Sequence, residues 1–163
     1  MQEEWRPIEG FPLYSVSNLG QVRRGFGKPV QVHTNQQGIA YISLMKGEEQ
    51  FHRGLARLVA KAFLEQKYAA FDTPINLDGN RLNCAVDNLV WRPRWFAITY
   101  HAQFKARYHD HTDQDIIDME TGFLYNGSWD VVTSLGLLER DVMLAIDNNT
   151  VVWPTYQRFR IDD

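Results

Sequence analysis

The sequence has little cysteine and no long apolar run. Cys84 is the single cysteine among 163 residues, which excludes an internal disulfide and fits a cytosolic protein or one assembled in a cytosol. We expect its thiol to be buried rather than reactive. No stretch approaches the ~20 apolar residues that span a bilayer, and residues 1–5 lack a basic segment followed by an apolar one. These absences predict no membrane partner and no signal peptide.

Internal repeats and low-complexity segments are also missing, which argues against a solenoid and against a disordered chain. Hydrophobic residues make up 44% of the composition and aromatic residues 13%, enough for a packed core. The net charge of −3 conceals an asymmetry. Residues 1–109 carry 14 Lys and Arg against 9 Asp and Glu, whereas residues 110–163 carry 3 against 11. Only the first part therefore has a cation excess suited to phosphates.

Turn residues and hydrophobic spacing predict an α+β fold. Short strands and turns are expected over residues 5–24, and a hairpin should pair residues 30–33 with 39–45. A turn signal at Asp78-Gly79-Asn80 predicts a second hairpin. An amphipathic helix is expected over residues 54–64, with an apolar face made of Leu55, Leu58, Val59, Ala62 and Phe63.

The second half of the chain should hold the remaining helices. Pro93 suits the first turn of a helix that runs to about Tyr108. Ser128 is a candidate N-cap for a helix that ends at Gly136. The other elements expected here are a hairpin of residues 116–119 and 122–125 that turns at 120–121, a helix over 138–147 and a final strand over 151–161. The two helices that meet at Gly136 suggest a helix-turn-helix.

Four stretches resemble the HNH homing endonucleases of phages and introns. Residues 5–11 and 14–23 look like the N-terminal modular DNA-binding motif of that family. Residues 57–63 are similar to the helix before the HNH hairpin, and Leu77-Asp78-Gly79-Asn80-Arg81-Leu82-Asn83 with Asp87-Asn88-Leu89-Val90-Trp91 resembles the HNH motif. The acidic tail, with Asp118-Met119-Glu120-Thr121-Gly122 and the two helices expected after it, resembles a C-terminal nuclease-associated module.

The resemblance implies three parts. These are an N-terminal β-rich nuclease-associated module over residues 1–50, an HNH-like ββα domain over 51–109, and an acidic module over 110–163 with a β-hairpin and a helix-turn-helix. It also implies a metal site in which a carboxylate and a helix asparagine bind the ion and a histidine activates water.

The resemblance places residues without that chemistry at the catalytic positions. The carboxylate and histidine positions fall on Ile75 and Asn76, and the helix asparagine falls on Ala97. The histidine often found before the Arg-Leu-Val sequence is Ala56. Isoleucine and alanine offer no ligand atom, and an amide cannot take a proton from water at neutral pH. Scaffold residues of the motif remain, namely Asp78, Gly79, Asn83, Asn88 and Trp91. We expect Asn88 to be a structural hydrogen-bonding residue.

Residues 91–97 combine two arginines with three aromatic residues. They could form a stacking and phosphate-binding surface, or the aromatic side chains could fill the vacated metal site. We expect Trp91 and Phe96 in the core and Arg92 and Arg94 on the surface. The candidates for nucleic-acid or partner binding are Arg23, Arg24, Arg53, Arg57, Arg92, Arg94 and Trp95, with Lys28 as a weaker addition.

The histidines offer two further possibilities. His52 could replace the missing base, although a histidine without a role is the alternative. His101, His109 and His111 suggest zinc only weakly, because their spacing includes no cysteine and no second cluster.

Three functions follow from these features. The first is a protein that binds double-stranded DNA without cleaving it, in the host cytoplasm or in a phage virion, with no metal. The second is a structural or protein-binding component with a phage or host protein as partner. The third is an active nuclease with a rearranged site that uses Asp78, Asn76, His52 or His101 together with magnesium or manganese.

Overall fold

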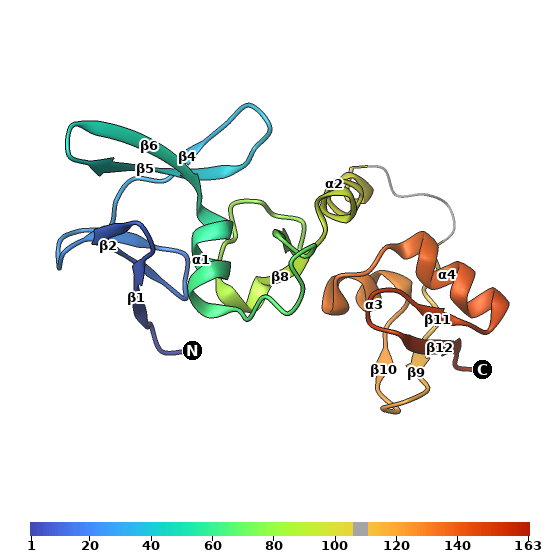
Figure 1. Ribbon diagram of the computed structural model, residues 1–163. Coiled ribbons are helices and arrows are strands. Elements are labelled where there is room, and N and C mark those ends of the chain that lie inside the picture. The colour runs from blue at the N-terminus through green and yellow to red at the C-terminus, as the bar shows by residue number, and fades with distance from the viewer. Residues whose placement is uncertain (106–110) are drawn as a thin grey trace. The chain divides into compact units, whose positions relative to one another are not determined.

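The computed structural model describes residues 1–105 and 111–163, and its chain forms two compact units. The first unit contains residues 1–76 and 80–97, and the second contains residues 77–79 and 98–163. Small antiparallel sheets and short helices make up both units, which confirms the predicted α+β class (Figure 1). Among the described residues no helix has both the length and the apolar character needed to cross a membrane.

The first unit begins with two three-stranded antiparallel sheets. One contains β1 (Trp5–Ile8), β2 (Phe11–Ser17) and β3 (Val22–Arg24), which confirms the strands predicted over residues 5–24. The other contains β4 (His33–Thr34), β5 (Ala40–Lys46) and β6 (Glu49–Gly54). The expected hairpin is confirmed, because β4 pairs with β5. Strand β6 has no counterpart in the sequence prediction, since its polar and mostly exposed residues show no alternation.

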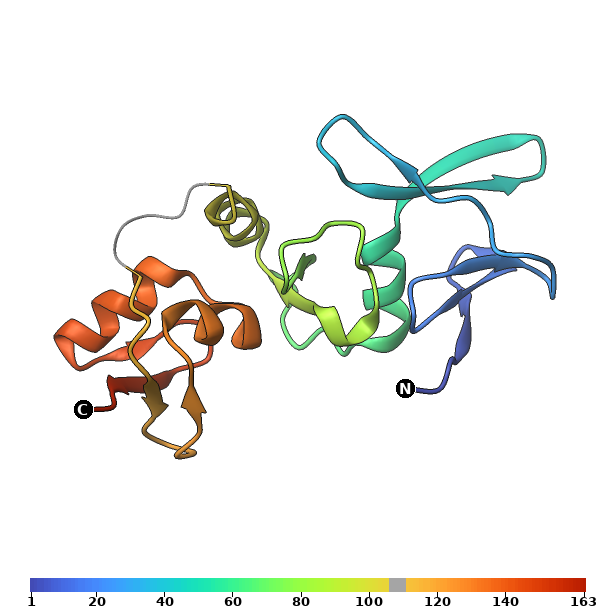
Figure 2. The same cartoon turned by 180° about the vertical axis from the view of Figure 1, so that it is seen from behind.

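Helix α1 (Leu55–Phe63) is the centre of the first unit and confirms the amphipathic helix. Leu55 and Val59 are buried, and the remaining residues of the predicted apolar face are half-buried. The helix contacts strands of both N-terminal sheets and also β7 (Thr73–Asn76) and β8 (Leu89–Arg92), as Figures 1 and 2 show from opposite sides. It therefore joins the N-terminal sheets to the hairpin that carries the HNH-like residues.

Strands β7 and β8 form the second predicted hairpin, but not as a tight turn. The register pairs Asn76 with Leu89, so residues 77–88 lie between the strands and include the short helix η1 (Val86–Asn88). The Asp78-Gly79-Asn80 turn stands at the start of this loop, where Gly79 has a φ of +75°. A turn signal in the sequence locates a local reversal of the backbone, whereas pairing of the strands is decided by distant residues.

Helix α2 (Arg94–Gln103) follows Pro93 directly, as expected for a proline at the first turn. The helix ends at Gln103, earlier than the prediction, whose end point Tyr108 lies outside the described residues. In the second unit the side-chain amide of Gln103 donates a hydrogen bond to the Leu137 carbonyl at 3.1 Å and accepts one from the Glu139 N–H at 3.1 Å. These bonds connect the end of α2 to the start of α4.

The second unit has a four-stranded antiparallel sheet in the order β10-β9-β12-β11. Its strands are β9 (Ile116–Asp118), β10 (Leu124–Tyr125), β11 (Val151–Val152) and β12 (Gln157–Ile161). The hairpin that turns at 120–121 is thereby confirmed. The single strand predicted over residues 151–161 is wrong, because the chain turns at residues 153–156 and β11 pairs with β12. Pro154 lies in that turn, and proline has no N–H for a sheet ladder.

Two helices cover this sheet, α3 (Ser128–Leu135) and α4 (Glu139–Asn148). Gly136 ends α3 in the left-handed conformation, as predicted. Ser128 is not the N-cap, a position that Gly127 occupies. The Ser128 hydroxyl instead donates to the Glu139 carboxylate at 2.8 Å and accepts the Thr112 N–H at 3.0 Å. It therefore ties α3 to α4 rather than closing the end of its own helix.

Asp118 is the charged residue on which the β9–β10 turn depends. It is fully buried, and its carboxylate accepts the Glu120 N–H at 2.9 Å and the Gln157 side-chain N–H at 2.8 Å. Burial alone would raise the pKa of Asp118, but hydrogen bonds from Glu120, Thr121 and Gln157 outweigh it and hold the pKa below its usual value. The ionised carboxylate therefore stabilises the folded second unit.

We expect Asp118→Asn to lower the free energy of unfolding by about 1–2 kcal/mol at pH 7, since it removes charge-assisted hydrogen bonds. The folded-state pKa is depressed, so the stabilisation is complete above the unfolded pKa of about 4 and is lost as the pH falls through the folded pKa. Urea titrations at pH 7 and at lower pH measure this, and the difference between the two proteins should shrink in acid. Asp113→Asn, at an exposed position, is the control and should change stability by less than about 0.5 kcal/mol.

Candidate functional site

The hairpin positions that resemble the nuclease site are buried in the first unit. Ile75 is 0% exposed and Asn76 is 3% exposed, both at the end of β7. The side-chain amides of Asn76 and Asn88 both donate to the Asn83 carbonyl, each at 2.9 Å. Two amides on one carbonyl fix the loop between the strands. Asn88 is thus the structural hydrogen-bonding residue that the sequence suggests, and Asn76 shares that role.

The helix position of the site is equally apolar. Ala97 is 4% exposed in α2, and its methyl group offers no lone pair to a cation. In the part of the chain that the structure describes, no group of three His, Cys, Asp or Glu side chains is placed to hold a metal ion. The three positions that the resemblance assigns to the nuclease site thus carry an isoleucine, an amide and a methyl group, of which only the amide could weakly coordinate a cation.

Residues 91–97, which include the end of β8 and the start of α2, divide largely as expected between core and surface. Trp91 and Phe96 lie in the core, whereas Arg94 and Trp95 are exposed, Trp95 by 59%. The prediction for Arg92 is wrong, because this arginine is only 6% exposed. Its guanidinium lies 5.6 Å from the centre of the Phe96 ring and donates to the Trp91 carbonyl at 2.9 Å. An arginine that is buried to this extent is not a surface contact for DNA.

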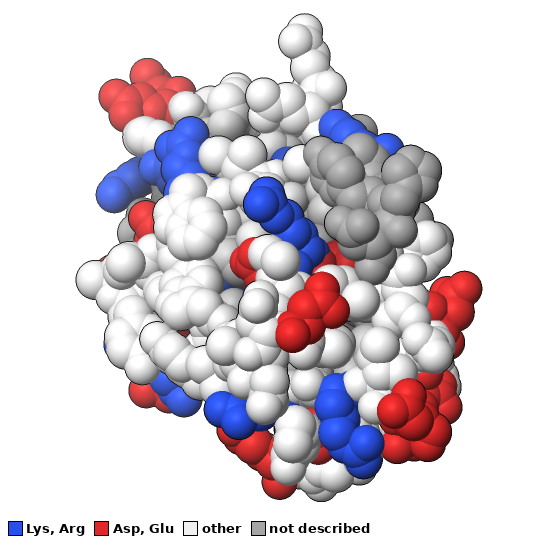
Figure 3. Space-filling model, turned by 90° about the vertical axis from the view of Figure 1, so that its right-hand side faces the viewer, with Lys and Arg blue, Asp and Glu red and all other residues white. Residues whose placement is uncertain are grey.

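The other predicted binding arginines differ in exposure. Arg24, Arg53 and Arg57 are exposed, while Arg23 is half-buried with its guanidinium 4.0 Å from the centre of the Trp5 ring. Lys28 is exposed. On the face drawn in Figure 3, Lys and Arg side chains are separated by acidic and uncharged surface, the grey residues excepted.

Three of the four histidines that the sequence singles out lie within the described residues. His52 lies on β6, where its ring is 3.0 Å from the Ser43 hydroxyl and packs edge-on against Tyr41. Its contacts are with the sheet of β5 and β6, not with the Asn76 side chain. His101 packs against the Tyr100 ring and His111 is exposed, while His109 lies outside the described residues. Ala56 is half-buried in α1.

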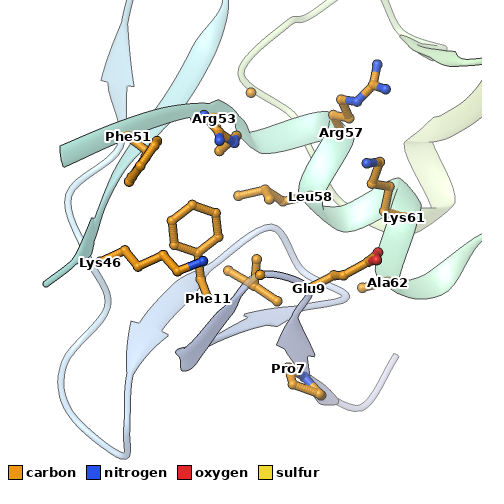
Figure 4. Close-up of a pocket in the computed structure, with 13 residues that line it drawn as sticks. Pro7, Glu9, Phe11, Lys46, Phe51, Arg53, Arg57, Leu58, Lys61 and Ala62 are labelled. Carbon is orange, nitrogen blue, oxygen red and sulfur yellow. The ribbon is translucent and has the colours of Figure 1, made fainter. Parts of the chain in front are cut away.

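Sequence reasoning missed a hollow of about 490 Å³ in the first unit. Figure 4 shows it between the β1–β2 turn, the sheet of β5 and β6, and α1. We call it the α1 hollow, and its lining side chains include Lys46, Phe51, Arg53, Leu58, Lys61 and Phe11. These residues come from three separate segments, so no local motif marks the group. The spacing of Arg57 and Lys61 on one helical face was the only signal available.

Comparison with known proteins supports the resemblance. Residues 3–44 match the NUMOD4 motif. Two proteins of Acanthamoeba polyphaga mimivirus are similar. "Uncharacterized HNH endonuclease L247" is 35% identical over 92 residues, which are 54% of this chain and 22% of that protein. "Uncharacterized HNH endonuclease L245" is 30% identical over 91 residues, which are 56% of this chain and 27% of that protein. The chain thus spans about a quarter of the length of these curated relatives.

A solved structure described as "DNA binding and cleavage by the HNH homing endonuclease I-HmuI" has a similar fold, with a TM-score of 0.53. The match covers 98% of both chains at 24% identity. The predicted resemblance to HNH endonucleases with an N-terminal nuclease-associated motif is therefore confirmed. The two curated relatives come from a giant virus, and the phage origin stays a prediction.

Proposed function

We propose that this HNH-endonuclease-like chain binds double-stranded DNA and does not cleave it. The observation that carries the proposal is the chemistry of the nuclease positions, where the side chains of Ile75 and Ala97 are apolar and buried and the Asn76 amide donates to the Asn83 carbonyl. A general base alone contributes roughly 10²–10⁴-fold to a rate, and the metal contributes a further large factor. Without the general base and the metal, the chain keeps the fold of the nuclease but not the groups that cleave a phosphodiester.

DNA is the partner that the remaining features support. Residues 1–109 hold 14 of the 17 Lys and Arg residues, and several of these side chains are exposed in the first unit. The NUMOD4 match lies in the same region, and the similar solved protein is described as binding DNA. Exposed cations release counterions from phosphates, which supplies affinity without any catalytic group.

Duplex binding should depend strongly on salt. If about four phosphates are neutralised, the slope of log K against log salt concentration should be about −3.6, at roughly −0.9 for each phosphate on B-DNA. Arg24→Gln and Arg94→Gln each remove one exposed cation and should each reduce the slope by about one phosphate contact. Fluorescence anisotropy or gel-shift titrations with a duplex at 50–200 mM salt give these slopes.

Arg92→Gln is the contrasting variant, because its buried guanidinium should leave the salt slope unchanged even if stability falls. Binding that ignores salt, or the absence of binding at low salt, contradicts the proposal.

A protein partner is the second candidate function. The observation in its favour is a set of exposed apolar side chains on the β9–β10 hairpin of the acidic second unit, namely Met119, Phe123 and Leu124. This candidate gains support if duplex DNA fails to bind at low salt and a stable protein complex is recovered instead.

A further inference from the structure

The α1 hollow gathers cations that no acidic side chain neutralises. In Figure 4, Lys46 extends into it from the end of β5 and Lys61 extends from α1 on the opposite side, with Arg53 beside Phe51. Glu9 is the single acidic residue in the lining. Within the described residues, none of these three cations has a carboxylate within 4.0 Å. Convergent cations that outnumber the one acidic side chain and form no salt bridge with it indicate an anionic ligand.

Arg57 also lines the hollow, but its guanidinium has another partner. It donates to the Asp72 carbonyl at 2.9 Å, and Figure 4 shows the group directed away from Lys46 and Phe51. The arginine therefore contributes mainly its aliphatic stem to the wall. Two lysines at opposite edges remain for the phosphates of a ligand, while Arg53 donates to the His52 carbonyl at 2.9 Å and keeps its guanidinium beside the Phe11 and Phe51 rings.

The floor of the hollow is aromatic rather than polar. The rings of Phe11 and Phe51 meet edge to face at 5.6 Å, and the Arg53 guanidinium lies 5.4 Å and 5.2 Å from their centres. An arginine plane on aromatic rings is a surface on which a nucleobase can stack. Lysines on both sides of such a surface suit the phosphates that flank the base.

Base-paired DNA cannot stack on such a floor, because the faces of its bases are covered by their neighbours inside the helix and only the base edges and the backbone are accessible. The volume falls in the range of ligand pockets, roughly 300–1,000 Å³. We propose that the α1 hollow binds an unpaired nucleotide of single-stranded DNA, with its base on Arg53 and Phe51 and its phosphates at Lys46 and Lys61. The assignment to DNA rests on the proposed function, whereas the nucleotide site itself does not.

The test measures anisotropy of a labelled thymidylate hexamer with the full chain at 50 mM salt. Lys46→Gln with Lys61→Gln should raise the dissociation constant about tenfold, because two phosphate contacts are lost. A hexamer of the same charge with abasic sugars should bind about tenfold more weakly to the unmodified chain, since stacking is lost. The matched control is Lys67→Gln with Lys105→Gln, which removes two exposed charges outside the lining and should spare hexamer binding.

Several outcomes overturn the proposal. Equal binding of the abasic hexamer would show an anion site without base recognition. An equal loss in the control variant, or an equal loss of duplex binding in the Lys46 and Lys61 variant, would show general attraction to charge. Tighter binding of a uridylate hexamer would exclude DNA as the preferred ligand.

One outcome separates the nucleotide site from the proposed function. If duplex DNA does not bind while the hexamer still requires Lys46 and Lys61, the proposed function fails and the nucleotide site stands.

Discussion

Ile75→Asp, Asn76→His and Ala97→Asn together should create magnesium- or manganese-dependent nicking of plasmid DNA. The unmodified chain should nick no faster than a protein-free control. The three changes supply a metal carboxylate, a base and a helix ligand at the positions that the resemblance to HNH endonucleases assigns to them. The base alone is worth roughly 10²–10⁴-fold, so we expect a gain of at least about 10²-fold in the nicking rate. Asn76→His by itself should give no activity, because a base without a metal does not stabilise charge on the phosphate.

The triple variant should also reveal its metal in thermal unfolding. Ile75 is fully buried, and an isolated carboxylate there loses its hydration and destabilises the fold. A divalent cation that binds only the folded state restores stability in proportion to its concentration. The melting temperature of the triple variant should therefore rise with magnesium or manganese, whereas that of the unmodified chain should stay constant. This measurement shows ion binding even if nicking is slow.

Two results would contradict this interpretation of the site. One is metal-dependent nicking by the unmodified chain that is lost in Asp78→Ala or His52→Ala, since a rearranged site would then be active. The other is a folded triple variant that neither nicks DNA nor gains stability with metal, since the positions would then not converge on one ion.

Much of the scaffold could be predicted because its signals are local. The face shared by Leu55 and Val59 defines α1, and Gly136 ends α3 in the conformation that glycine favours. The structural role of Asn88 follows from the same logic, because a buried amide must find a backbone partner, here the Asn83 carbonyl. In each case the physical cause lies within a few residues of the signal.

What the sequence could not predict depends on residues far apart in the chain. Arg92 is an exception, because its guanidinium lies over the Phe96 ring only four residues along the chain, yet no spacing distinguishes this buried arginine from the exposed Arg94. The α1 hollow brings Lys46 of β5 near Lys61 of α1 only through the tertiary fold. Ser128 bonds to Glu139 across two helices, which a capping pattern does not anticipate. Side-chain partners of this kind have no periodicity, so propensity and spacing cannot identify them.

Gly79→Ala should destabilise the second unit much more than Gly122→Ala. Both glycines have positive φ, +75° and +74°, so alanine pays the same conformational penalty of about 1–2 kcal/mol at each. A Cβ at Gly122 meets no atom within 4 Å, whereas a Cβ at Gly79 would lie 2.3 Å from the Phe104 ring. Relieving that overlap should add about 1–3 kcal/mol, for a total of about 2–5 kcal/mol at Gly79.

The ring of Phe104 is held by neighbours, which is why we expect it to resist displacement. It packs against Tyr100 at 5.4 Å and Trp129 at 4.9 Å between ring centres, both within the second unit. Urea unfolding followed by tryptophan fluorescence measures the two losses. A double-mutant cycle isolates the cause, because in a Phe104→Ala background the cost of Gly79→Ala should fall to that of Gly122→Ala. Equal costs of the two substitutions in the unmodified background would show that the ring moves aside freely and that backbone conformation alone explains glycine in the Leu-Asp-Gly turn.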